Sequence, residues 1–477
     1  MAARLDLPDI QGLFARGYSK HPHARFTVFT ATGPATGPAS GPATGPATGG
    51  ALLNWLVPRV TTAAPFSGDV AVQVAFTASG LRWLGLPDRV VAGFPAEFTE
   101  GMTNANRSRF LGDVGESDPR HWGWGSPGQP QVDGIVMLYA TDQGLLEGQQ
   151  RELISRLADD GITGVTELPA LERGEFEPFG FHDGISQPVV AGLPKAGGAR
   201  QAVAAGEFVL GYPNARGQVP DSPLLPASDD PMRLLLPDPA GTGAVDLGRN
   251  GSYLVFRQLE QDVNGFWRFL DEATRRADGL EDPAARVALA AKMVGRWPGG
   301  APLVKAPGQD VPALSDDNDF TYRGDLPGMA CPVGAHIRRA NPRDSLPSDL
   351  ATSLATSGLH RLLRRGRSYG PAAGGPAGTG LYFMCLAANV SRQFEFVQHT
   401  WLNNATFNGL YDDADPLTGG RCSASAAFTV QARPVRRRYQ GLPQFVRTRG
   451  GAYFFLPGIS ALRYLAQLRK TDHRTQA

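Results

Sequence analysis

Short apolar segments with the alternation of β-strands recur in both halves of the chain, and helical segments separate them. In the first half we expect strands at 24–30, 69–76 and 134–140, where apolar side chains alternate or run together over the length of a strand. The sequence has no long series of strand–helix–strand units typical of a parallel sheet. This pattern predicts an α+β fold.

Helical patterns accompany these strands in a similar order in the two halves, although the halves share no visible sequence repeat. Thr77 or Ser79 can cap a helix over 77–85, because Ser and Thr oxygens accept from free N–H groups at a helix start. The other predicted elements are helices at 52–60, 143–158, 262–276, 283–297 and 392–401, strands at 252–257, 380–388 and 452–456, and a C-terminal helix before a polar tail.

Residues 31–50 form a tract of Gly, Pro, Ala, Ser and Thr with a period near four. Collagen has glycine at every third position, so this tract is not collagen-like. Its side chains can bury almost no apolar surface, and we therefore expect a disordered insertion in a surface loop. The whole chain has 477 residues, which is long enough for two or three domains.

Charge and cysteine content exclude several classes of function. Lys and Arg number 46 against 45 Asp and Glu, a net charge of +1 that gives no drive toward nucleic acid or an anionic membrane. Cys331, Cys385 and Cys422 are odd in number and widely spaced, which argues against a disulfide framework or zinc ribbon and suits a reducing compartment. The sequence shows no signal peptide and no run of membrane-spanning length, so we expect a soluble, cytoplasmic protein.

The segment CPVGAHIRRANPR, residues 331–343, places one histidine, His336, beside Arg338, Arg339 and Arg343. A lone imidazole is a poor zinc site, because zinc takes three or four protein ligands. A cofactor that needs one axial nitrogen and carries its own negative charges fits better, and haem is such a cofactor. The alternative is a histidine without any ligand, which is the usual fate of a lone histidine.

Two further segments carry polar groups that could serve a site. In GFHDGISQP, residues 180–188, Asp183 precedes Gly184, and a carboxylate on such a turn can point into a cavity or simply cap the turn. The segment LHRLLRRGRSYG, residues 359–370, is rich in arginine and reads as a solvated face or as an anion-binding segment. The sequence lacks a phosphate loop, a GxSxG elbow, an HExxH motif and a strand-led GxGxxG motif.

Taken in order, these segments resemble the dye-decolourising peroxidases. GFHDG matches the GxxDG motif of that family, GISQP continues it, and AHIRRANPR and RRGRSYG follow in the order the family has. DIQGLFARGY, NGSYLVFRQLEQDV and GLYFMCLAANVSRQFEFVQHTWLNN extend the resemblance over most of the chain. The resemblance implies an α+β fold of two ferredoxin-like domains with antiparallel sheets and peripheral helices. These would be residues 1–240, with the GxxDG loop, and residues 241–477, which would hold most of a haem b.

The resemblance also implies roles for the polar residues of the site. His336 would be the axial ligand of the haem iron, and Asp183 would be the distal acid–base group. The distal arginine would be Arg364, which lies six positions before the glycine of the closing Tyr-Gly pair. Arg343 or Arg338 would hold a haem propionate.

Three further positions follow from the same alignment. Leu381 and Phe383 would line the distal side of the haem. Members of the family often place a carboxylate behind the axial histidine, and the alignment puts Asn389 there. An amide accepts a hydrogen bond more weakly than a carboxylate, so the haem would be easier to reduce unless Glu395 takes this place.

The implied activity is that of a haem b peroxidase, which reduces hydrogen peroxide and oxidises dyes and phenols by one-electron steps. Asp183 would move a proton between the peroxide oxygens, and Arg364 would stabilise the developing negative charge. Because aspartate ordinarily has a pKa of about 3.9 and histidine about 6.5, this assignment predicts activity well below pH 6. The alternatives are a haem-binding storage or sensor protein and an enzyme that releases iron from haem.

The expected partners are hydrogen peroxide and small aromatic reductants, without nucleic acid or membrane, and a homo-oligomer is an open alternative to a monomer. Large donors cannot reach a buried haem, so aromatic side chains at the surface would relay their electrons. The candidates by residue type are Trp267, Trp297, Tyr322, Trp401 and Tyr439.

Overall fold

The computed structural model describes residues 4–31, 48–162, 164–193, 202–371, 378–420 and 426–468. Its centre is one nine-stranded sheet with the order β11-β13-β10-β16-β2-β3-β1-β4, and β12 pairs with β13 at the edge. Every pairing within this sheet is antiparallel. The strands are β1 (His23–Thr30), β2 (Val70–Phe76), β3 (Gly134–Ala140), β4 (Gly164–Pro169), β10 (Ser252–Gln261), β11 (Leu363–Arg364), β12 (Arg367–Tyr369), β13 (Gly380–Ala387) and β16 (Val446–Leu456).

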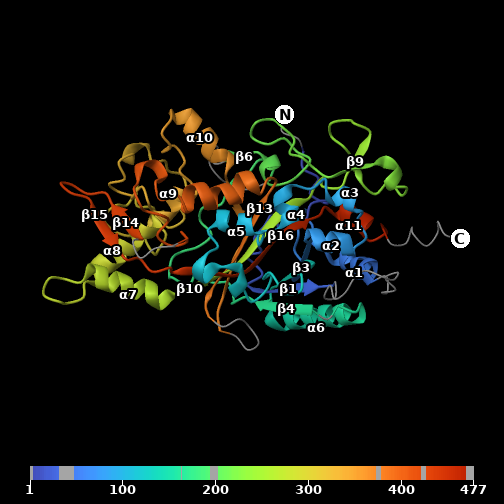
Figure 1. Ribbon diagram of the computed structural model, residues 1–477, viewed down its shortest axis with the longest axis horizontal. Helices are drawn as coiled ribbons and strands as arrows, with labels where there is room; N and C mark the ends of the chain where they lie inside the picture. The colour runs from blue at the N-terminus through green and yellow to red at the C-terminus, as the bar shows by residue number, and fades with distance from the viewer. Residues whose placement is uncertain are drawn as a thin grey trace.

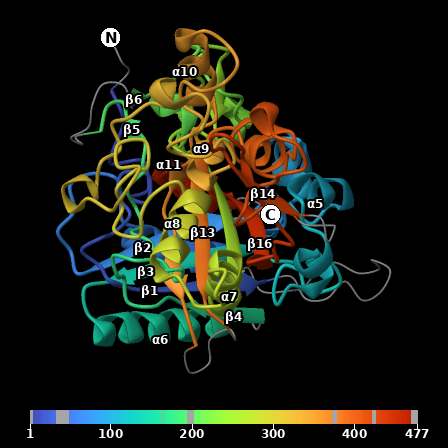
Figure 2. The ribbon, with the colours of Figure 1, turned by 90° about the vertical axis from the view of Figure 1, so that its left-hand side faces the viewer.

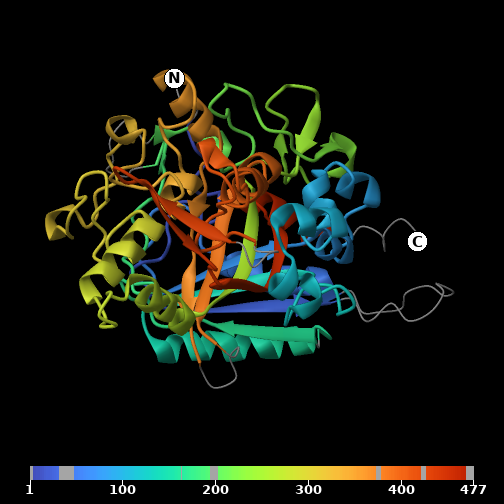
Figure 3. The same cartoon turned by 60° about the vertical axis from the view of Figure 1, so that its left-hand side comes forward.

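Apart from β12, the sheet consists of two four-stranded halves with the same topology. In the N-terminal half β1 lies between β3 and β4, and β2 lies on the other side of β3. Strands β10, β11, β13 and β16 repeat this arrangement, which is that of a ferredoxin-like unit. The halves join where Phe76 of β2 lies opposite Phe455 of β16. In Figure 3 the yellow-green, orange and red strands of the C-terminal half stand above the blue and teal strands. The predicted α+β class with two ferredoxin-like units is confirmed, and the boundary at 240/241 stays a prediction.

Helices cover both halves of the sheet. Helix α6 (Gln143–Asp159) lies along β1 and β4 at the lower edge of Figures 1 and 2, and Asp142 caps it by accepting from two backbone N–H groups. Helices α7 (Val263–Thr274) and α8 (Pro283–Val294) pack side by side against the C-terminal half. The remaining α-helices are α1 (Thr48–Leu56), α2 (Ala78–Trp83), α3 (Asp88–Val91), α4 (Ala96–Glu100), α5 (Ala105–Leu111), α9 (His336–Ala340), α10 (Leu350–Leu359) and α11 (Ile459–Leu465).

Short elements fill the connections. The small strands are β5 (Val189–Val190), β6 (Ala202–Val203), β7 (Leu224–Pro226), β8 (Leu236–Pro237), β9 (Ala244–Asp246), β14 (Ala427–Val430) and β15 (Arg437–Gln440). The 3₁₀ turns are η1 (Val57–Arg59), η2 (Gly115–Ser117), η3 (Pro119–His121), η5 (Ala205–Glu207), η6 (Ala227–Asp229), η7 (Pro312–Leu314), η8 (Arg323–Asp325) and η11 (Phe407–Gly409). Two π-helical turns, η9 (Ser391–Glu395) and η10 (Val397–Leu402), form one continuous helix.

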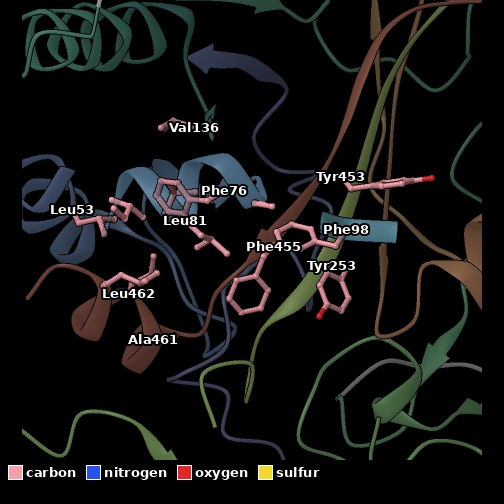
Figure 4. Close-up of a cluster of buried hydrophobic side chains, with 14 of the residues drawn as sticks. Leu53, Phe76, Leu81, Phe98, Val136, Tyr253, Tyr453, Phe455, Ala461 and Leu462 are labelled. Atoms are coloured by element: carbon pink, nitrogen blue, oxygen red, sulfur yellow. The ribbon is translucent and has the colours of Figure 1, made fainter. Parts of the chain in front are cut away.

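A large apolar core joins the two halves. Figure 4 shows Phe76 and Leu81 of the N-terminal half beside Phe455 and Tyr253 of the C-terminal half. The rings of Tyr253 and Phe455 lie 6.0 Å apart between their centroids, and Leu462 of α11 packs into the same cluster. Buried apolar area is the main stabilising contribution in such a core, so the two ferredoxin-like units are held together by one core as well as by one sheet.

Some predicted features differ from the structure or lie outside it. The predicted disordered tract is wrong for residues 48–50, which begin α1 because Leu52, Leu53 and Leu56 bury one face of that helix. The other part of the tract, residues 32–47, lies outside the described residues, as do Cys422 and the polar tail from residue 469. Cys331 and Cys385 are buried and free. In the described part of the chain, every helix is too short or too polar to cross a membrane.

Candidate active site

A cavity of about 300 Å³ lies beside the C-terminal half of the sheet and brings together residues far apart in the sequence. Its walls come from the 177–186 loop, the face of β10 and β13, helix α9 and the helix formed by η9 and η10. Six of the eight predicted site residues line it: Asp183, His336, Arg343, Arg364, Leu381 and Phe383. Arg338 and Asn389 do not.

His336 begins helix α9, and a buried carboxylate holds its ring. The Nδ1 atom lies 3.0 Å from Oδ2 of Asp415. Burial alone would raise the pKa of the Asp415 carboxyl, but His336, the N–H of Thr418 and nearby Arg339 outweigh it and lower this pKa to about 2. The neutral tautomer that donates Nδ1–H to Asp415 keeps the lone pair on Nε2, and Nε2 makes no hydrogen bond to any residue that the structure describes. This is the state of an imidazole ready to bind a metal.

The prediction that Asn389 stands behind His336 is wrong, because Asp415 occupies that place. Asn389 lies where β13 ends, and its Oδ1 accepts from the N–H of Arg392 at 2.7 Å, so it caps the following helix. Glu395 does not take its place either, because it binds Arg107 at 3.0 Å and the hydroxyl of Tyr453. The alignment missed Asp415 because a loop returns it to His336 from far along the chain, and no local pattern marks such a return.

Strand periodicity explains which arginine faces the cavity. Side chains alternate between the faces of a strand, and Leu363 of β11 is buried in the core, so its neighbour Arg364 points to the opposite face. Arg365 and Arg367 lie on the core side, where they donate to the backbone oxygens of residues 13–21. In β13, Leu381 and Phe383 face the cavity for the same reason.

Asp183 is carried by a tight loop opposite this strand. Its N–H donates to the oxygen of Glu175 at 2.9 Å, and the flanking turn uses Gly184 at φ +83, a conformation that favours glycine. Asp183 and Arg364 also line a second cavity of about 220 Å³ that adjoins the first. The side chain of Arg364 makes no hydrogen bond or ion pair with any described residue. A carboxylate and a guanidinium that has no partner among the described residues therefore share one wall.

Arg343 gives one side of the cavity a positive charge, whereas Arg338 does not line the cavity. Arg343 lines the cavity while it donates to the oxygens of Asn318 and Phe320, and it stacks 3.8 Å over the ring of Phe320. Arg338 is fully buried behind the wall, where it donates to the oxygen of Cys331 at 2.7 Å and fixes the chain before His336. The prediction that Arg338 contacts a cofactor is therefore wrong.

Arg361 is a cavity residue that the sequence alone did not single out. It lines the cavity, and within the described chain its guanidinium makes no hydrogen bond or ion pair. Burial and the like charges of Arg343 and Arg364 lower its pKa to about 9. A buried cation without a carboxylate partner is costly, so this wall favours an anionic ligand.

The five aromatic side chains considered for electron relay are mostly interior. Trp297, Tyr322 and Trp401 are buried, and Trp267 and Tyr439 are partly buried against one core cluster. These residues are candidates by residue type only, and the burial of three of them favours the alternative of a core role over a relay at the surface. Their apolar rings are packed, which is the common role of aromatic residues in a core.

Comparisons with known proteins agree on one family. No family model matches the chain. The dye-decolorizing peroxidase of Exidia glandulosa is 31% identical over 96% of this chain and 86% of its own length. The multifunctional dye peroxidase DyP2 of an Amycolatopsis species is 30% identical over 83% of this chain and 82% of its own.

Solved structures give the same result for the fold. The crystal structure of a fungal DyP-type peroxidase from Auricularia auricula-judae aligns with a TM-score of 0.76 and 27% identity, over 98% of this chain and all of the other. Sequence identity of this extent over nearly the whole length indicates common descent. The chain therefore belongs to the dye-decolorizing peroxidase family, whose members are oxidoreductases that act on peroxide.

Proposed function

We propose that this protein is a haem b peroxidase that reduces hydrogen peroxide and oxidises aromatic donors such as dyes and phenols one electron at a time. The observation that carries the proposal is the cavity itself, which has a carboxylate-backed imidazole, His336, and an Asp183–Arg364 pair in its walls. A storage or sensor protein would need the imidazole, but it would have no use for a carboxylate that transfers protons or a guanidinium that stabilises negative charge.

The residues of the cavity fit haem. His336 offers one free ring nitrogen, as an axial ligand requires. Leu259, Leu381 and Phe383 give the apolar surface that a porphyrin needs. Arg361 is a buried guanidinium that lacks a partner among the residues described, and carboxylates such as propionates would neutralise it.

The protein's own groups would perform the proton chemistry. Asp183 would accept a proton from one oxygen of hydrogen peroxide and return it to the other, which leaves as water. Arg364, which has no counter-ion of its own, would stabilise the negative charge that grows on the leaving oxygen. Bound haem would supply the two-electron reduction of the peroxide, and aromatic donors would replace these electrons one at a time.

Steady-state turnover tests the proposal directly. Protein reconstituted with haem should oxidise two molecules of a phenol for each hydrogen peroxide consumed, and it should do so below pH 6. A protein that binds haem but consumes no peroxide would contradict the proposal and support a sensor or storage role. Release of free iron from haem during incubation would support the iron-releasing alternative.

Replacing Asp415 should change the reduction potential of bound haem. The carboxylate makes the imidazole of His336 more electron-rich, which stabilises ferric iron. Asp415→Asn should therefore shift the midpoint potential to more positive values, where about 59 mV corresponds to a tenfold change in the equilibrium. A spectroelectrochemical titration measures this shift. Asn389→Ala is the matched control and should leave the potential unchanged, since Asn389 only caps a helix.

Replacing Arg361 should weaken the binding of haem more than the binding of its uncharged ester. We expect Arg361→Leu to weaken the binding of haem about tenfold or more, because a hydrogen bond to a charged group contributes roughly 1.5–3 kcal/mol. Binding of haem dimethyl ester, which has no propionate charge, should change little. Absorbance titrations of the apoprotein measure both affinities, and Arg151→Leu on the exposed face of α6 is the control. Equal losses for haem and its ester would exclude a propionate contact.

A further inference from the structure

A shallow groove of about 690 Å³ lies on the surface next to the candidate active-site cavity. It is bounded by residues 171–178, the end of β10 and the start of α7. Glu177 and Gln261 line both the groove and the cavity, and Gln261 Nε2 donates to Glu177 Oε2 at 2.8 Å. These two side chains therefore border both spaces.

The loop that carries Asp183 also forms one side of this groove. The loop folds back on itself, so the N–H of Asp183 donates to the oxygen of Glu175 and the N–H of Glu177 donates to the oxygen of Phe181, each at 2.9 Å. Phe176 lies opposite His182 in this pairing. Paired backbones lie only about 4.8 Å apart. A molecule against Phe176 would thus be separated from the cavity by one thin layer of chain.

The groove exposes unusually large apolar side chains. Phe176 is 53% exposed and Leu171 is 41% exposed, and both line the groove. Adjacent exposed apolar residues in a concave surface are typical of a binding site. The flat face of Phe176 suits an aromatic ring or a cation.

Carboxylates without a cationic partner set the charge of the groove. Glu172 has no ion pair with any residue of the described ranges, and the carboxylate of Asp262 only caps α7. Glu260 is neutralised by Arg449 at 2.9 Å and by Arg447 at 3.7 Å. Glu172 and Asp262 therefore give the groove two carboxylates that have no cationic partner among the described residues.

The second cavity, on the other side of Asp183, has the opposite charge, since Arg173, Arg364 and Arg365 line it. A positively charged molecule would be repelled there and attracted to the groove.

We infer that this groove binds aromatic electron donors that carry a positive charge, such as phenols or anilines with an ammonium group. This rests on the proposed peroxidase function, because the donor would be oxidised from this position. Each phenol loses one electron and one proton, so two phenols and one hydrogen peroxide give two phenoxyl radicals and two water molecules. Phe176 would contact the cation or ring, and Glu172 would attract the charge.

The test uses two phenols of nearly the same shape. One is (4-hydroxyphenyl)trimethylammonium, whose charge is permanent, and the other is the neutral 4-tert-butylphenol. With the haem-loaded enzyme at low salt we expect kcat/KM to favour the cation about tenfold. Phe176→Ala should reduce this preference about two- to fivefold, because a surface cation–π contact contributes roughly 0.5–1 kcal/mol. Glu172→Gln should reduce it by a similar factor, because it removes a carboxylate that attracts the cation. The loss should appear in KM and not in kcat.

Matched controls and a binding measurement separate the site from the peroxidase activity. Tyr411→Ala and Glu281→Gln remove an exposed aromatic and an exposed acid outside the groove, and they should leave the preference intact. Calorimetry of the cation with resting enzyme should show binding that Phe176→Ala weakens, whether or not peroxide is turned over. Turnover of the neutral phenol without any preference for the cation, or a preference untouched by both groove variants, would overturn the inference. Binding without turnover would contradict the proposed function alone.

Discussion

His336→Ala should abolish the tight binding of haem and with it the Soret absorption band of a histidine-ligated iron. Among the described residues, this imidazole is the one histidine ring that lines the cavity and is backed by a buried carboxylate, Asp415. The neighbouring His182 ring lies on the loop at the cavity wall, 4.0 Å from exposed Asp316. We expect the affinity for haem to fall by two orders of magnitude or more, since loss of even an outer-shell partner costs about 10–100-fold. An absorbance titration of the apoprotein measures this.

Two controls distinguish the loss of the axial ligand from unfolding of the variant. His399→Ala removes an exposed histidine that stacks on Phe110 outside the cavity, and it should bind haem like the unchanged protein. Free imidazole added to His336→Ala should restore part of the band, because the vacated space can accept the ring. If His336→Ala kept the unchanged Soret band without added imidazole, the axial assignment would be wrong.

Asp183→Asn and Arg364→Leu should slow the reaction with hydrogen peroxide while haem binding persists. A positioned acid–base group contributes about 10²–10⁴-fold, and a preorganised cation at a developing charge contributes about 10²–10³-fold. Both residues line the cavity wall, and neither side chain makes a hydrogen bond or ion pair with a residue that the structure describes. Stopped-flow absorbance at pH 5 and pH 7 measures the second-order rate constant.

A control variant and the pH dependence of the rate distinguish proton transfer by Asp183 from a general effect of removing a negative charge. Asp316→Asn, which removes an 86% exposed carboxylate near the same loop, should react at the unchanged rate. Asp183→Asn should lose the activity below pH 6 that a carboxylate base provides. A rate in Asp183→Asn within threefold of the unchanged protein at both pH values would rule out the acid–base role.

The sequence predicted features that local patterns determine. Residues 134–140 form β3 as expected, because an unbroken apolar run of strand length is buried on both sides. The spacing of the family motif predicts Arg364, and not its neighbouring arginines, as the distal arginine. The alternation of side chains along β11 puts Arg364 on the cavity side. The motif segments around Asp183 and His336 likewise meet in one cavity, as their order in the family implied.

Features that depend on distant contacts could not be predicted in this way. Asp415 reaches His336 from a loop that carries no metal-ligand pattern, and the alignment placed Asn389 there instead. Arg338 and Arg361 look alike in sequence, yet backbone oxygens satisfy the first and the second faces the cavity without a partner in the described chain. The contact of Phe76 with Phe455 that joins the two half-sheets also has no local signal.

One measurement tests the proposed peroxidase most directly. Protein reconstituted with haem is mixed with one equivalent of hydrogen peroxide at pH 5, and the Soret band is followed in a stopped-flow spectrometer. We predict a rapid loss of the resting spectrum, and its return after two equivalents of a phenol are added. A spectrum that stays unchanged with peroxide, or that bleaches without recovering when the phenol is added, would contradict a peroxidase built on His336, Asp183 and Arg364.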